Sequence, residues 1–203
     1  MNKGKEFLDA KERAGESLKK ASDNHVVDEQ ILPILKLLNN FPEYYTSSSC
    51  AGRIVLLEIP AIGDKKQAKF LGKWHRTIMI DELFKSSKTA DKGFLWLLAQ
   101  SPILHVGTLD LNAAEKLVKL AILSGFKNSS IRSIGKTIVI ELCSTERLDA
   151  PIGKDSVLFC ESTYLQLLVD VSNSVMEKSK MKLERLEKNL RKSLSTSKTT
   201  IDL

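Results

Sequence analysis

One long stretch, residues 163–192, carries apolar side chains at a spacing close to that of a heptad repeat. These are Leu165, Leu168, Met176, Leu183, Leu186 and Leu190. Such a repeat predicts a single helix with one apolar seam. Ser172 and Ser179 interrupt the seam, which favours packing against the rest of a monomer over a coiled-coil dimer. The polar residues 193–203 lack a helical pattern and predict a flexible tail.

Shorter patterns supply the other elements. Apolar runs predict strands at 53–59, 77–80, 103–108 and 137–142, and helical patterns occur at 5–22, 26–38 and 91–100. A further helix follows Asn112, a candidate N-cap, and ends at Gly125, whereas Pro33 begins or kinks an earlier one. The prediction is an α+β fold in which helices pack on a mixed β-sheet. We expect a charged helix at 1–24, an α+β catalytic domain at 25–162, a basic helix at 163–192 and the tail at 193–203.

Two segments of the chain resemble each other. Residues 52–59 (GRIVLLEI) align without a gap with residues 135–142 (GKTIVIEL). The match allows an internal duplication, although a glycine, a cation and an apolar run also describe any turn that enters a strand. If the duplication is real, Arg53 and Lys136 could converge on one anionic ligand.

Composition narrows the class of protein. No run approaches 18 apolar residues and the amino terminus lacks an apolar signal core, so we expect no membrane span and no secretion. The three cysteines are widely spaced, which argues against a disulfide framework or a zinc site and for the cytoplasm. The net charge of +6 and pI of about 9.1 favour a polyanionic partner. Cations between Lys178 and Lys192 could contact phosphates or form a solvated face.

A hydroxyl-rich segment precedes the apolar run at 54–57 and is a candidate for the entrance of a ligand-binding site. It consists of Thr46-Ser47-Ser48-Ser49-Cys50-Ala51-Gly52-Arg53. Gly52 lets a ligand approach the backbone, and Arg53 offers a forked donor for phosphate or carboxylate. The alternative is a serine-rich loop entering a core strand, with Cys50 as a small buried side chain.

Several other residues could carry chemistry. Trp74-His75-Arg76 combines a stacking surface, a titratable ring and a cation, but Trp74 could equally fill the core. His105 alternates with apolar strand neighbours and could be structural or a ligand contact. Cys50 with His75 or His105 could form a nucleophile pair. The fingerprints of dinucleotide-binding folds, phosphate-binding loops and zinc hydrolases are absent from the sequence.

Residues 46–54 resemble the S-x-S-S-C-x-G-R-I signature of the tRNA wybutosine-synthesizing methyltransferase family. Further matches follow in the same order: Ile103-Leu104-His105-Val106, then Gly125-Phe126-Lys127-Asn128-Ser129-Ser130-Ile131, then Arg147-Leu148-Asp149-Ala150-Pro151. The resemblance covers roughly residues 27–152. It implies S-adenosylmethionine as cofactor and phenylalanine tRNA as substrate, methylated at N-4 of the tricyclic base beside the anticodon. No metal is expected, because the sequence has no closely spaced Cys/His set.

Under this resemblance, the catalytic candidates are Ser48, Ser49, Cys50, His75 and His105. Substrate or cofactor contacts are expected at Thr46, Gly52, Arg53, Trp74, Asn128 and Ser129. Methyl transfer depends on the orientation of the two reactants and on a proton acceptor, and it requires no covalent intermediate with the protein. The alternatives are a non-catalytic RNA-binding module, in which the same groups clamp an unstacked base, and a thiol enzyme that uses Cys50.

Overall fold

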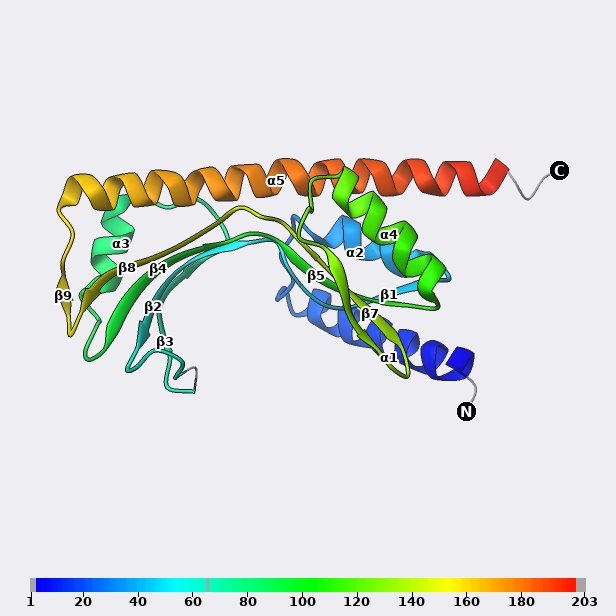
Figure 1. Cartoon of the computed structure of the whole chain (residues 1–203), viewed down its shortest axis with the longest axis horizontal. Coiled ribbons are helices and arrows are strands. Elements are labelled where there is room, and N and C mark those ends of the chain that lie inside the picture. The colour runs from blue at the N-terminus through cyan, green and yellow to red at the C-terminus, as the bar shows by residue number, and fades with distance from the viewer. Residues whose placement is uncertain (1–2, 65, 200–203) are drawn as a thin grey trace. The chain divides into compact units, whose positions relative to one another are not determined.

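The computed structural model describes residues 3–64 and 66–199, which form an α+β fold (Figure 1). The chain divides into two compact units. The first unit comprises residues 1–51, 102–145 and 180–203, and the second comprises residues 52–101 and 146–179. Helix α5 (Ser162–Thr199) contributes residues to both units. Within the described ranges, no helix is long and apolar enough to cross a membrane.

The first unit contains a four-stranded sheet in the order β1-β5-β7-β6. Buried residues alternate along its central strands, so Leu104, Val106, Ile140 and Leu142 form one core with apolar residues of α2, α4 and the last part of α5. Helix α1 contacts the other side, where the rings of Phe7 and Tyr45 lie 5.4 Å apart. The bounds are α1 Lys3–Asp23, α2 Leu32–Asn40, β1 Tyr44–Cys50, β5 Ile103–Thr108, α4 Leu111–Leu123, β6 Ser130–Ile134 and β7 Ile138–Cys143.

The second unit contains a five-stranded sheet in the order β3-β2-β4-β8-β9. Ile54, Leu56, Leu95 and Leu97 lie on one face and share a core with α3 and the first part of α5. The seam of α5 predicted from the sequence is confirmed, because all six of its apolar residues are buried. The bounds are β2 Arg53–Ile59, β3 Lys69–Trp74, α3 Ile80–Ser87, β4 Phe94–Gln100, β8 Arg147–Lys154 and β9 Val157–Leu158.

The α+β class is confirmed, but the sheet arrangement differs from the prediction. Instead of one mixed sheet there are two sheets, and every strand pair between described residues is antiparallel. The two similar segments become β2 and β7, which belong to different units. The convergence of Arg53 and Lys136 therefore stays a prediction.

The strand predicted at 77–80 is wrong. This stretch leads into α3, where the Glu82 carboxylate accepts a hydrogen bond from the Met79 backbone amide at 3.0 Å. The same carboxylate pairs with Arg76 at 2.6 Å, and this hydrogen bond, with that from Met79, lowers the pKa of Glu82 to about 2. A carboxylate that accepts the amide of the residue before the first helical turn favours a helix start, which the apolar pattern does not reveal.

The helix predicted at 91–100 is also wrong, because residues 94–100 form β4. This strand pairs with β2 on one side and β8 on the other. A short apolar run cannot be assigned to a strand or a helix by periodicity alone, and here the pairing partners decide.

Other elements differ from the prediction in type or in bounds. The serine-rich segment, whose alternative interpretation was a loop, is part of strand β1. Helix α2 begins at Leu32 and not at residue 26, and Pro33 lies in its first turn, which is one of the two roles expected for this proline. Helix α5 continues to Thr199, so residues 193–199 are helical instead of tail, and residues 200–203 lie outside the described residues.

The start of α4 provides a test of the fold. The Asp110 carboxylate accepts a hydrogen bond from the Ala113 amide at 2.8 Å, so Asp110 is the N-cap and Asn112 is not. We expect Asp110→Ala to lower the free energy of unfolding by about 1 kcal/mol, because it removes the partner of a helix-terminal amide. Asn112→Ala is the matched control and should cost much less in the same urea titration. The opposite order of the two effects would contradict the assignment.

Candidate functional site

The hydroxyl-rich strand β1 is held at an edge of the first unit's sheet. Its neighbour is β5, and the register shifts between Thr46 and Ser48. The side chain of Asn39 binds Thr46 twice, donating to its hydroxyl at 2.7 Å and accepting from its amide at 3.1 Å. Beyond the strand, the Asp28 carboxylate accepts from the amide of Ala51 at 2.8 Å. These side chains fix both ends of the serine run.

A row of three polar side chains crosses this sheet. Ser48 lies opposite His105 in β5, and His105 lies opposite Glu141 in β7. Directly opposed residues share a face, so all three side chains lie on the face away from Leu104 and Val106. Ser48 Oγ is 2.8 Å from His105 Nδ1, and His105 Nε2 is 2.9 Å from Glu141 Oε2. The result is a continuous hydrogen-bonded row from a hydroxyl to a carboxylate.

Burial within this row increases toward the carboxylate. The Ser48 residue is exposed, whereas the side chains of His105 and Glu141 are 30% and 14% exposed. Arg132, on the edge strand β6, places Nε 3.4 Å from the same Glu141 oxygen. An ionised carboxylate can only accept hydrogen bonds, so Glu141 fixes the orientation of the imidazole. The order of hydroxyl, imidazole and carboxylate resembles a hydrolase triad, but the two ring nitrogens are exchanged.

This row can hold and transfer a proton. A neutral His105 that donates from Nε2 leaves Nδ1 as an acceptor toward Ser48. A proton released near Ser48 can then pass to Nδ1, and the resulting imidazolium is stabilised by Glu141. The geometry supports a general base that needs no covalent intermediate.

The same strand also lines a cavity of about 310 Å³ within the first unit. Thr46, Ser47, Ser48 and Ser49 line one side of it. Opposite them lie mainly small or apolar residues from α1, α2 and the connection between them: Ala14, Ser17, Leu18, Ala21, Val26, Val27 and Leu35. Apolar walls with a few polar groups are typical of small-molecule sites.

The remaining predicted residues of the first unit occupy structural positions next to the row. Cys50 ends β1 opposite Ile103, which in turn lies opposite Cys143. The Ser129 hydroxyl donates to the Phe126 carbonyl at 2.7 Å and accepts from the Cys143 amide at 3.2 Å. The amide of Asn128 donates to the carbonyl of Cys143 at 3.0 Å. These bonds fix the turn before β6, in which Asn128 is exposed.

The other predicted residues belong to the second unit. Gly52 has a φ of 102°, a conformation that favours glycine, and Arg53 begins β2. Trp74 is partly buried against the core, and its ring lies so close to Gly72 that a Cβ there would be 2.0 Å from it. This position agrees with the alternative role of Trp74 as a core residue. His75 follows β3 and is half-buried.

Sequence reasoning missed Glu141, Arg132, Asn39 and Asp28. The sequence pattern could have identified Glu141 as a candidate. It is the single acidic residue of an otherwise apolar strand, and it aligns with Glu58 in the repeated segment. Glu58 is 1% exposed and pairs with Lys69 at 3.5 Å. A carboxylate within a buried run needs a partner, which could have directed attention to the neighbouring histidine.

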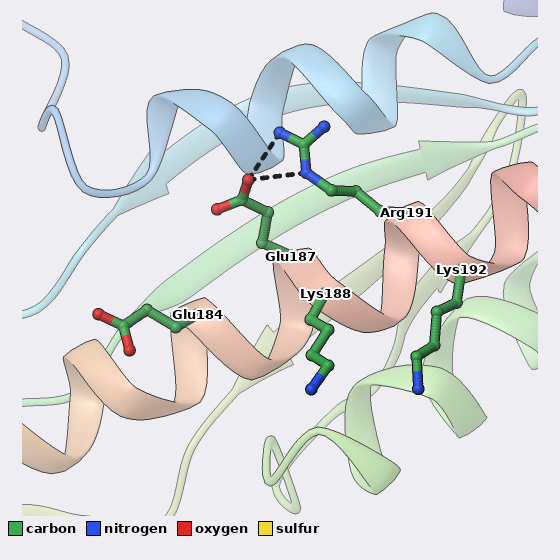
Figure 2. Close-up of a pocket in the computed structure, with 5 residues that line it drawn as sticks. All are labelled: Glu184, Glu187, Lys188, Arg191 and Lys192. Atoms are coloured by element: carbon green, nitrogen blue, oxygen red, sulfur yellow. Dashed lines mark hydrogen bonds and ion pairs between the residues drawn. The ribbon is translucent and has the colours of Figure 1, made fainter.

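Helices α4 and α5 of the first unit carry several cations. Figure 2 shows Lys188 and Lys192 pointing to the same side of α5, away from the pair formed by Arg191 and Glu187 at 2.7 Å. Lys192 also lines a hollow of about 700 Å³ with two lysines of α4, Lys116 and Lys119. Two of the lysines have partners in the same unit: the Lys182 ammonium group donates to the Ser144 hydroxyl at 2.7 Å, and Lys119 pairs with Glu115 at 2.7 Å.

Comparisons with known proteins agree in naming one family. The family model described as Methyltransferase TYW3 matches residues 8–192. A relative from Pyrococcus horikoshii, named tRNA(Phe) 7-((3-amino-3-carboxypropyl)-4-demethylwyosine(37)-N(4))-methyltransferase 1, is 45% identical over 185 residues, covering 91% of this chain and 94% of the relative. The relative from Methanocaldococcus jannaschii, with the same name apart from the final numeral, is 41% identical over 181 residues, covering 88% and 94%.

Solved structures agree with this match. A protein from Pyrococcus horikoshii superposes with a TM-score of 0.89 at 44% identity, covering 94% of this chain and 98% of that chain. A hypothetical protein from Aeropyrum pernix gives a TM-score of 0.71 at 25% identity, covering 81% and 98%.

The hydrogen-bonded row predicts the tautomer of His105. We expect neutral His105 to carry its proton on Nε2, because the Glu141 carboxylate needs a donor there. Long-range ¹H–¹⁵N NMR correlations of the imidazole ring distinguish the two tautomers. Glu141→Leu removes the acceptor and should reduce this preference, whereas Lys127→Gln, in a turn outside the row, should not. A neutral ring protonated on Nδ1 in the wild type would refute the orientation.

Proposed function

The chain belongs to the TYW3 methyltransferase family, and we propose that it methylates N-4 of the tricyclic wyosine-type base beside the anticodon of phenylalanine tRNA. The names of its relatives support this substrate. We further propose that it works in the cytoplasm as a monomer, with S-adenosylmethionine as methyl donor and without a metal ion. A non-catalytic RNA-binding module is not favoured, because the chain belongs to a methyltransferase family.

The hydrogen-bonded row on β1, β5 and β7 is the observation that carries this proposal. It places a histidine base against a serine within the segment that carries the family signature. A nitrogen that gains a methyl group must lose its proton for the base to remain neutral. Ser48 would receive this proton and pass it to His105 Nδ1, while Glu141 stabilises the charged ring. Between turnovers, the Arg132 guanidinium partly neutralises the negative charge of the Glu141 carboxylate.

The cavity beside the serine run fits the cofactor. Its apolar walls suit an adenine ring, and the hydroxyls of Thr46, Ser47 and Ser49 suit a ribose or the polar end of the amino acid. When bound, S-adenosylmethionine supplies an electrophilic methyl group. Holding the two reactants in one orientation would provide most of the acceleration. Cys50 and His75 remain candidates for contacts with the cofactor or the base. For Cys50 we propose packing against the ligand and no covalent role.

Methyl transfer is tested directly with labelled cofactor. The protein is incubated with methyl-labelled S-adenosylmethionine and phenylalanine tRNA that carries the 4-demethyl tricyclic base. Nucleoside mass spectrometry should then find the label on that base, and tRNA with an unmodified guanosine should remain unlabelled. Absence of transfer from a folded protein that binds both ligands would contradict the proposed function.

His105→Gln should lower kcat by about 10² to 10⁴, because a positioned general base contributes that much. KM for the tRNA should change little, since the row acts on a proton and not on binding. Ser133→Ala is the control, because Ser133 is exposed on the edge strand β6 and lies opposite Val139, outside both the hydrogen-bonded row and the cavity lining. Equal loss of activity in both variants would show that His105 does not act as the base.

The lysines of α4 and α5 should contact tRNA phosphates. We expect the triple change of Lys116, Lys188 and Lys192 to Gln to weaken tRNA binding. The slope of log affinity against log salt should become shallower by about 0.9 for each phosphate that the variant no longer neutralises. Affinity for S-adenosylmethionine should stay unchanged. The control is the double change of Lys85 and Lys88 to Gln at α3, and a salt slope unchanged in the triple variant would indicate a merely solvated surface.

A further inference from the structure

The sheet of the second unit has one face that its helices leave open. Ile54, Leu56, Leu95 and Leu97 point into the core with α3 and α5. Their neighbours in β2 and β4 therefore point to the opposite face. On that face, Leu57 lies directly opposite Trp96, and Phe70 of β3 lies opposite Leu57. Both helical segments described for this unit pack on the core face.

This open face is partly exposed despite its apolar centre. Phe70 is 57% exposed, and Leu57, Trp96 and Leu98 are each half-buried. Covering an aromatic ring as exposed as Phe70 gains free energy, because apolar surface is then removed from water.

Arg53 lies along the same face and is held there. Its Nε donates to the Gln100 side chain at 2.7 Å, and its guanidinium carbon lies 5.8 Å from the centre of the Phe70 ring. Gln100 comes from β4 and Phe70 from β3, so the guanidinium spans three neighbouring strands. A planar cation held beside an aromatic ring can stack on a base or pair with a phosphate.

Cations surround the apolar centre. Lys73 lies opposite Val55, and the Lys154 ammonium lies 5.3 Å from the centre of the Phe94 ring. Arg147 lies opposite Gln100 and pairs with Asp149, which is itself on this face. The face thus carries four cations, Arg53, Lys73, Lys154 and Arg147, while the Asp149 carboxylate pairs with Arg147 and the Asp155 carboxylate lies 3.9 Å from the Lys154 ammonium. This balance favours a polyanion.

We propose that this face, defined by Arg53, Phe70, Lys73, Trp96 and Leu98, stacks an unpaired base of the tRNA anticodon loop while its cations hold the flanking phosphates. Aromatic rings that receive bases, combined with cations that follow the backbone, are the usual means of binding single-stranded nucleic acid. The inference rests on the proposed function for the identity of the RNA. It assigns the stacking role to Trp96 and Phe70 and leaves Trp74 in the core.

Tryptophan fluorescence tests this assignment, because the chain has two tryptophans, Trp74 and Trp96. Trp74→Phe leaves Trp96 as the sole reporter, and Trp96→Phe leaves Trp74. Each full-length variant is titrated with an RNA hairpin that has the anticodon stem and loop of phenylalanine tRNA. Saturable quenching of Trp96, with little change at Trp74, supports the proposal. Quenching confined to Trp74, or no quenching of Trp96 at RNA concentrations that saturate binding, overturns it.

Affinity provides a second readout. Phe70→Ala should weaken hairpin binding about 5- to 150-fold, the loss typical of one aromatic stacking contact. Tyr164→Ala is the matched control, because Tyr164 is 50% exposed on α5, a helix that packs on the opposite face of the sheet. Equal affinities of the Phe70→Ala variant and the wild type would also overturn the proposal.

Failure of this inference is distinguishable from failure of the proposed function. The fluorescence and binding experiments need neither methyl donor nor tricyclic base. Stacking on Trp96 without methyl transfer would leave the surface in place and remove the reaction. Methyl transfer with an unresponsive Trp96 would keep the reaction and place the base elsewhere.

Discussion

The antiparallel register between β1 and β5 determines what the first unit can do. Side chains alternate with a period of two, so a slip of one residue would turn Ser48 toward the core and separate it from His105. The shift in register between Thr46 and Ser48 sets this alignment, and Asn39 stabilises it by binding both the amide and the hydroxyl of Thr46. The serine run can therefore hold polar groups at fixed positions although it lies at an edge.

Each sheet has one face that packs on the main apolar core of its unit and a second face that carries polar or aromatic side chains; in the first unit, helix α1 also packs on part of this second face. In the first unit that second face holds the proton-transferring row, and in the second unit it holds Arg53 beside Phe70. An antiparallel sheet permits this division, because only one of its faces has to be buried. We infer that methyl transfer uses the first face for proton removal and the second for holding RNA.

The sequence predicted the parts of the fold whose burial produces a clear pattern. Strands β2, β5 and β7 are mostly apolar runs, and the leucine repeat of α5 follows from its packing. The sequence did not predict β1, because its serines have low strand propensity and it is stabilised by pairing with β5, which is distant in the chain. Strand β4 was predicted as a helix, because its apolar run lacks the alternation of a half-buried strand. Both of its faces are apolar, one toward the core and one on the open sheet face.

The sequence predicted several residues of the candidate site but not the hydrogen bonds and ion pairs that join them. His105 and Ser48 were recognised by the family signature, whereas Glu141 and Arg132 entered only when strand pairing brought them together. Trp74 and Trp96 show the same limit, since residue type alone does not reveal which face of a sheet a ring occupies. Pairing between strands that are distant in the chain decides which residues meet and which face a side chain occupies. This pairing cannot be derived from the pattern of a single sequence.

The central claim is that the serine run of β1 holds the methyl donor beside His105. Backbone NMR spectra of the ¹⁵N-labelled protein, recorded during titration with S-adenosylmethionine, test this most directly. We expect the largest amide shift changes at Ser47, Ser48, Ser49 and His105, and we expect them to saturate together. Saturable changes confined to other elements, with the amides of β1 and β5 unmoved, would contradict the claim.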